Sequence, residues 1–121
     1  MITGVHALMF SHDADAVRRF LRDVLEFPSV DAGGGWLIFG LPPSELAVHP
    51  TEDAGRHELY LMCDDIDATV AKLRDKGVEF DGDIMERGFG RATSIILPDG
   101  GRLAIYQPTH PTPPPPNADS C

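Results

Sequence analysis

The chain has 121 residues, of which 42% are hydrophobic and 24% charged, and its net charge is −9. This size and composition predict one globular domain with a buried core. The acidity argues against nucleic acid or a membrane surface as a partner, because phosphate groups attract clustered lysine and arginine. The sequence contains no apolar run long enough to span a bilayer, and we expect no secretory signal because its first residues lack a basic region followed by a long apolar run. Because it has only two cysteines, we expect no disulfide framework and a cytoplasmic location.

The first half of the sequence predicts a strand, a helix and three short strands. Residues 4–10 alternate as a strand does, and Asp13 is a residue type that caps helix N-termini. The apolar stripe of the helix recurs at helical spacing and consists of Val17, Phe20, Leu21, Val24 and Leu25. Pro28 ends the helix. Between residues 29 and 50, short apolar runs separated by glycine and proline predict the three strands.

The second half predicts the same order of elements. Residues 57–63 read as a strand, and Asp65 caps a helix that stops at Gly77. Further strands are expected at residues 78–80, 92–97 and 102–106. A shift of 52 residues relates the pairs Asp13/Asp65, Asp15/Asp67 and His6/Glu58. A repeat of this length indicates two copies of one supersecondary unit.

The repeat defines the predicted fold class and the domain boundaries. We expect an α+β fold built from two βαβββ units in tandem, the first at residues 3–50 and the second at 56–108. Both units belong to a single domain of residues 1–110. The segment 111–121 is rich in proline, so we expect an extended tail that adds nothing to the core.

Three segments resemble a known family. These are Val5-His6 at the start of the first strand, the strand-to-helix step Cys63–Asp67, and the ending Leu97–Pro108. Together with the repeat, they are similar to the vicinal oxygen chelate superfamily, which includes glyoxalase I, bleomycin-resistance proteins, fosfomycin-modifying enzymes and extradiol dioxygenases. The resemblance covers about residues 3–108. It implies a curved mixed sheet around a concave pocket.

The resemblance also implies positions for metal ligands. Metal-dependent members hold a divalent ion at the positions that correspond to His6, Ala47, Glu58 and Ala104. Alanine cannot coordinate a metal, and a catalytic zinc site usually keeps more protein ligands than one histidine and one carboxylate. We therefore expect no metal cofactor. The alternative is one Zn, Ni, Fe or Mn ion with a changed ligand set, in which His49 replaces a lost ligand from the same strand face.

The expected ligand site combines aromatic walls with a polar floor. Its predicted residues are His6, Trp36, Phe39, His49, Glu58, Phe89, Arg91 and Tyr106. Phe89 lies between two glycines in a loop that we expect to be mobile, and Arg91 offers a hydrogen-bond donor for an acidic ligand group. His6 and Glu58 are the candidate catalytic residues, because an imidazole and a half-buried carboxylate can both move protons near neutral pH.

The functional hypotheses follow from these residues. The first is metal-independent binding or sequestration of a small organic molecule, as in bleomycin-resistance proteins. The second is a divalent-metal lyase or dioxygenase, and the third is a metal-free enzyme with Glu58 or His6 as the base. The resemblance further implies a homodimer. The sequence does not identify the ligand, nor whether the units pair within one chain or between two.

Overall fold

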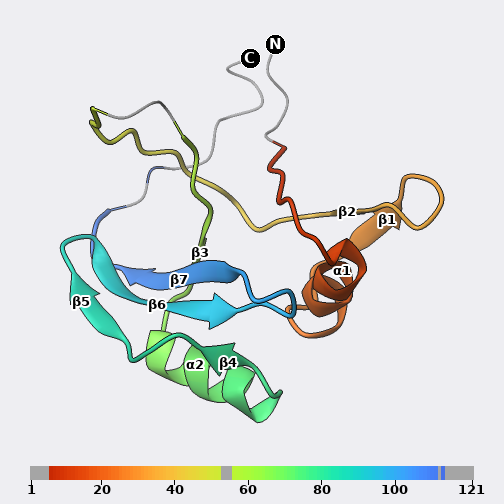
Figure 1. Ribbon diagram of the computed structural model, residues 1–121. Helices are drawn as coiled ribbons and strands as arrows, with labels where there is room; N and C mark the ends of the chain where they lie inside the picture. Colours follow the sequence, from red (N-terminus) through yellow and green to blue (C-terminus); the bar gives the residue numbers. More distant parts are fainter. Residues whose placement is uncertain (1–5, 53–55, 112, 114–121) are drawn as a thin grey trace.

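A computed structural model describes residues 6–52, 56–111 and 113. In these residues the elements are α1 (Ala14–Asp23), β1 (Ser29–Asp31), β2 (Leu37–Phe39), β3 (Tyr60–Met62), α2 (Ile66–Asp75), β4 (Glu79–Phe80), β5 (Met85–Arg87), β6 (Gly90–Ile96) and β7 (Arg102–Pro108) (Figure 1). The predicted α+β fold class is confirmed by the two helices and the mixed sheet. Neither helix has the length and apolar composition needed to cross a membrane. Nearly all of the predicted tail lies outside the described residues.

Both helices begin at the aspartates that the repeat relates. The Asp13 carboxylate accepts a hydrogen bond from the backbone N–H of Ala16, at 3.2 Å. The Asp65 carboxylate accepts the equivalent bond from Ala68, at 3.1 Å. Each carboxylate satisfies a backbone donor that has no partner within its helix, so the predicted caps are confirmed.

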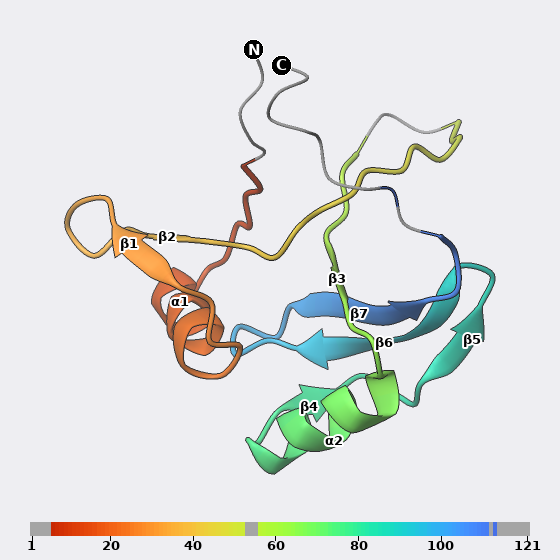
Figure 2. The same ribbon diagram turned by 180° about the vertical axis from the view of Figure 1, so that it is seen from behind.

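The main sheet is organised around β7. Its strand order is β3-β7-β6-β4, and β5 pairs with β6 outside this path. The short strand β3 lies parallel to β7, with Leu61 opposite Ile105, whereas β6 and β7 form a long antiparallel pair. In both views of the molecule, α2 covers one face of this sheet (Figures 1 and 2).

The hydrophobic core lies between the sheet and the two helices. Its buried members are Phe20, Leu73, Val78, Ile95, Leu97, Leu103 and Ile105. Phe20 is the contribution of α1, so the helix of the first unit packs into the core of the second. Polar contacts support this packing: the Ser11 hydroxyl donates to the Asp99 carboxylate, and the Lys76 ammonium donates to the carbonyl of Val24 at 3.2 Å.

The first half differs from the sequence prediction at both of its outer strands. Residues 6–10 and 46–48 form no strand, and residues 4–5 lie outside the described part. A strand is stable only when a neighbour satisfies its backbone groups, and within the described residues of this half only β1 and β2 pair. Both segments are also uncovered, since Phe10 is 93% exposed and Val48 is 90% exposed. They lie on the side of the main sheet away from α2 (Figure 2).

The loop expected to be mobile around Phe89 is a tight hairpin turn. It joins β5, which the sequence did not predict, to β6, and the carbonyl of Phe89 accepts a hydrogen bond from Thr109 at 3.0 Å. Gly90 has φ +154°, and a Cβ atom there would lie 2.2 Å from the carbonyl oxygen of Gln107. The turn therefore needs glycine at position 90 for close approach to β7.

We predict that Gly90→Ala destabilises the protein, because the new Cβ collides with the backbone of β7. The expected loss is about 1–3 kcal/mol, the usual cost of overpacking. Gly88→Ala is the matched control, since a Cβ atom at Gly88 meets nothing within 4 Å. Urea unfolding of both variants measures the difference, and an equal effect of the two substitutions would contradict the close approach.

Candidate functional site

The two faces of the main sheet have different chemistry. On β7, Leu103 and Ile105 point into the core, so Ala104 and Tyr106 alternate onto the other face. Tyr60 lies opposite Ala104 in the register, and Met62 lies opposite Tyr106. This second face carries no helix, and it leaves Tyr60 42% exposed and Met62 39% exposed.

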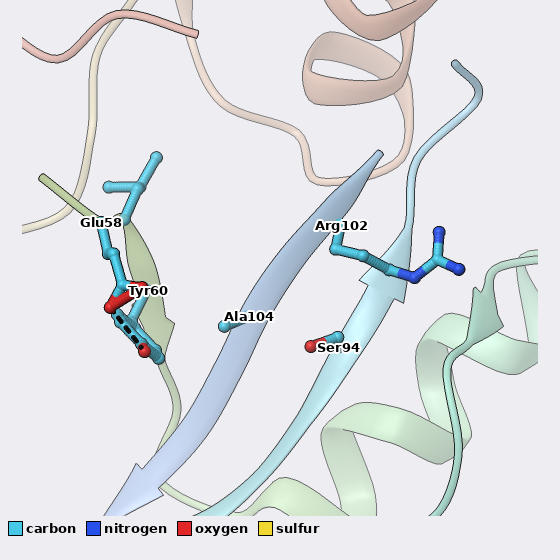
Figure 3. Close-up of a pocket in the computed structure, with 6 residues that line it drawn as sticks. Glu58, Tyr60, Ser94, Arg102 and Ala104 are labelled. Atoms are coloured by element: carbon cyan, nitrogen blue, oxygen red, sulfur yellow. Dashed lines mark hydrogen bonds between the residues drawn. The ribbon is translucent and has the colours of Figure 1, made fainter. Parts of the chain in front are cut away.

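An open hollow of about 270 Å³ lies on this face, and it is lined by Glu58, Leu59, Tyr60, Ser94, Arg102 and Ala104. Figure 3 shows its construction: the short side chains of Ala104 and Ser94 lie between Glu58 and Tyr60 on one side and Arg102 on the other. Ser94 is opposite Ala104 in the β6–β7 register. The small residues on these adjacent strands leave the space that larger side chains would fill.

Glu58 and Tyr60 form a polar pair at the edge of the hollow. The Tyr60 hydroxyl donates a hydrogen bond to Glu58 Oε1 at 3.2 Å (Figure 3). The other carboxylate oxygen, Oε2, is 3.8 Å from Nε of Arg56. Burial of the phenol raises the pKa of Tyr60, and the negative charge of Glu58 raises it further. The pair therefore presents a neutral phenol and an accepting carboxylate oxygen.

Three aromatic rings gather beside this pair. Tyr60, Phe89 and Tyr106 contact one another edge to face, with centroid distances of 6.2, 5.9 and 5.3 Å. Such geometry places ring edges against ring faces and favours a fixed cluster. Tyr106 is only 9% exposed, whereas Phe89 and Tyr60 keep open surface. The cluster thus provides an apolar wall that a planar molecule can contact.

A histidine from beyond β7 completes the cluster. The Tyr106 hydroxyl and His110 Nε2 are 3.1 Å apart, and the two rings lie 5.9 Å apart. The Nδ1 atom of His110 is 2.9 Å from the carbonyl of Pro111 and 3.9 Å from the carboxylate of Glu45. Burial raises the pKa of Tyr106, and the charge of Glu45 raises it further. Glu45 therefore reaches the end of the β7 segment from a distant part of the chain.

Arg102 at the far side of the hollow is already neutralised. Its Nε donates to the Asp81 carboxylate at 2.9 Å, and another guanidinium N–H donates to the carbonyl of Gly100. These contacts hold the Arg102 guanidinium beside Asp81 and Gly100. The hollow consequently offers aromatic surface, small apolar residues and the Glu58 carboxylate rather than a free cation.

The structure brings together three of the predicted ligand-binding residues. Glu58 contacts Tyr60, and Tyr60 contacts both Phe89 and Tyr106. Ala104, one of the positions implied for a metal ligand, lies on the same face beside them. Strand pairing and alternation place Tyr60, Ala104 and Tyr106 on this face, and the turn between β5 and β6 places Phe89 beside them.

The other predicted residues lie elsewhere. His6 and His49 are exposed on the two segments that form no strand, and Phe39 is half-buried on β2. Trp36 lies against Arg18, whose guanidinium carbon is 5.6 Å from the ring centroid. None of the described contacts joins these residues to the aromatic cluster.

Arg91 is engaged by carboxylates on the other side of the sheet. Its guanidinium donates to Asp67 at 2.6 Å and lies 3.2 Å from the carboxylate of Glu86. Hydrogen bonds to Arg91 lower the pKa of Asp67. Arg91 alternates with Ala92, which lies opposite Tyr106, so its side chain projects to the helix side. Its role as a ligand contact stays a prediction.

Several residues of the site were absent from the predicted set. Tyr60 carried a usable signal, because it follows Glu58 by two positions and shares its strand face. Ser94 becomes visible only through the register of β6 with β7. Glu45 and His110 carried no local signal, because their proximity depends on how distant segments fold.

The implied metal positions are not assembled in the described residues. Glu58 and Ala104 share one face, while His6 and Ala47 lie on the segments without strand structure. Across residues 6–52, 56–111 and 113, no group of three or more His, Cys, Asp or Glu side chains is placed to hold a metal ion. The present arrangement can bind a planar ligand by ring contacts and accept a hydrogen bond at Glu58. The expectation that no metal is required stays a prediction.

The sequence and the fold are similar to those of known proteins. The model of the Glyoxalase/Bleomycin resistance protein/Dioxygenase superfamily matches residues 4–109. TnmS3, an antibiotic binding protein from Streptomyces sp. CB03234, has a similar structure with 24% identity and a TM-score of 0.61, covering 90% of this chain and 100% of its own. Lactoylglutathione lyase from Agrobacterium tumefaciens is 15% identical with a TM-score of 0.63, covering 87% of this chain and 92% of its own.

A further solved structure comes from the same Streptomyces strain as TnmS3. It is a glyoxalase/bleomycin resistance protein that is 25% identical, with a TM-score of 0.54, and covers 80% of this chain and 93% of its own. No curated protein matches the sequence. Because the family model spans most of the sequence, the chain belongs to the Glyoxalase/Bleomycin resistance protein/Dioxygenase superfamily.

Proposed function

We propose that the protein binds and sequesters a small organic molecule on the open face of the main sheet, without a metal ion. The observation that carries the proposal is the cluster of Tyr60, Phe89 and Tyr106 beside a hollow floored by Ala104. Binding of this kind needs concave apolar surface and a few polar groups, but no activated water. The structural similarity to an antibiotic binding protein supports an antibiotic as the ligand. The aromatic cluster favours one with planar rings.

Catalysis by a divalent metal is the alternative with support from the comparisons. A lyase is among the structural neighbours, and Glu58 remains available as one ligand. It would need further ligands from His6, His49 or the substrate. A metal-free enzyme with Glu58 or His6 as base is the third possibility. In that case Glu58 has the better placement, because it lies at the hollow while His6 is exposed on an unpaired segment.

We further propose that the protein works as a homodimer. The unpaired segments 6–10 and 46–48 are the repeat equivalents of β3 and the start of β7, which pair with each other in the second half. They expose alternating large apolar side chains, and Leu46 is 87% exposed. An uncovered apolar face with unpaired backbone is a typical interface for a second copy. Such a copy would also border the open face of the site.

We predict that Phe89→Ala weakens binding of a planar aromatic antibiotic by about 1–3 kcal/mol, the scale of aromatic anchors at interfaces. The ligand is chosen by thermal shift from a panel of such antibiotics, and calorimetry on folded protein gives the affinity. Phe20→Ala is the control: it should cost about 3–5 kcal/mol of stability and leave affinity unchanged. Equal loss of affinity in both variants would place the site elsewhere.

We predict that protein purified without chelators contains far less than one equivalent of Zn, Ni, Fe or Mn after dialysis, as measured by elemental analysis. The double variant Ala47→Glu with Ala104→Glu should gain metal in the proposed dimer, where pairing of the segments 6–10 and 46–48 would bring the implied ligand positions together. Ala71→Glu on α2 is the control and should gain none. One bound metal per wild-type chain would refute sequestration without metal.

We predict a dimer in sedimentation velocity at micromolar concentration. Phe10→Asp and Val48→Asp should each shift the protein to monomer, because a charge would be buried in the interface. The control is Val30→Asp, since Val30 is also exposed, at 67%, but lies on the paired strand β1. A wild-type monomer, or equal dissociation in all three variants, would contradict the proposed interface.

A further inference from the structure

A second hollow lies between α1 and the β1–β2 hairpin, away from the site described above. Its volume is about 320 Å³, and it is lined by Asp15, Arg18, Arg19, Arg22, Asp31, Gly35 and Leu37. Helix α1 and strand β1 lie side by side in both views of the molecule (Figures 1 and 2). The hollow is thus bounded by one helix face and one hairpin.

Three guanidinium groups meet at this hollow in a protein whose net charge is −9. Arg18 pairs with Asp15 at 3.0 Å, and Arg22 pairs with the neighbouring Asp23 at 2.7 Å. Within the part of the chain that the structure describes, Arg19 forms no salt bridge, and it interacts with Asp23 only through its longer-range charge. Its donors are therefore available to a bound anion.

The acidic residue of the hairpin has its charge partly satisfied by the backbone. One oxygen of the Asp31 carboxylate accepts hydrogen bonds from the N–H groups of Gly33 and Gly35, at 2.7 and 3.2 Å. This bonding holds the Asp31 side chain to its own loop, where Gly33, Gly34 and Gly35 all have positive φ. The arginine side of the hollow is left as the surface that can engage a ligand.

Trp36 lies close enough to the hollow for its fluorescence to report on binding there. Arg18 lines the hollow and also lies over the Trp36 ring, at 5.6 Å from the centroid. The indole is 64% exposed and is the only tryptophan of the sequence. A change in the position or charge environment of Arg18 should alter tryptophan fluorescence, because the cation contacts the ring.

We propose that this hollow binds the phosphate or carboxylate group of a small molecule, with Arg19 as the first contact. The guanidinium N–H groups that Arg18 and Arg22 do not use in their bonds to Asp15 and Asp23 are the supporting donors. Guanidinium groups suit such anions because their planar donors form paired, charge-assisted hydrogen bonds. This site shares no lining residue with the hollow on the open face of the sheet. It would assign anion binding to the α1 arginines, which take no part in the aromatic cluster.

Trp36 fluorescence during titration with inorganic phosphate, and separately with benzoate, tests the proposal. We expect a saturable change with at least one anion, and weaker binding as sodium chloride is added. Arg19→Gln and Arg22→Gln should each weaken it at least about tenfold. Arg74→Gln on α2 is the matched control and should leave it unchanged. Thermal melting confirms that each variant is folded.

Three results would overturn the proposal. One is the absence of a saturable change with either anion. Another is an equal response to benzyl alcohol, which has a ring but no charge. The last is unchanged affinity in folded Arg19→Gln and Arg22→Gln. Because Phe89 lies outside this hollow, unaltered anion binding in Phe89→Ala would separate this site from the one proposed for an organic ligand.

Discussion

Strand β7 is the constraint on which the rest of the structure depends. Among the described residues it is the one strand of the main sheet that pairs in parallel with one neighbour, β3, and antiparallel with the other, β6. Its alternation sends Leu103 and Ile105 into the core and Ala104 and Tyr106 to the open face. Stability and binding surface are therefore coupled, because a register shift by one residue would exchange the two sets.

The open face of the main sheet can bind a ligand because some of its side chains are small, as well as because others are polar or aromatic. Alanine at position 104 and serine at 94 leave space beside Glu58 where a larger pair would close the sheet surface. The rings of Tyr60, Phe89 and Tyr106 border that space in fixed edge-to-face contacts. Gly90 supports this arrangement from the backbone, since it lets the Phe89 turn approach β7 closely. Because these side chains are already held in place, binding of a ligand costs less conformational entropy of the protein.

The first unit is anchored to the second through its helix but does not complete its own sheet. Phe20 belongs to the same buried cluster as Ile95 and Leu103, and the Ser11 hydroxyl donates a hydrogen bond to the Asp99 carboxylate. Hydrogen bonds from Ser11 and from the Gly101 backbone lower the pKa of Asp99. This contact therefore contributes stability above the ordinary pKa of aspartate, and the contribution is lost as pH falls through the lowered value. The outer segments, by contrast, keep exposed apolar residues for which a second copy is the proposed partner.

The sequence by itself determined the repeat, both helices with their aspartate caps, the strands of the second unit other than β5, and the alternation that puts Glu58 and Tyr106 on one face. These features depend on local spacing, which a single chain displays directly. Only the tertiary structure decided that Arg91 pairs with Asp67, that Trp36 lies on Arg18, and that Glu45 reaches His110. Such contacts join segments far apart in the chain. They are fixed by register and by helix packing, which no local pattern records.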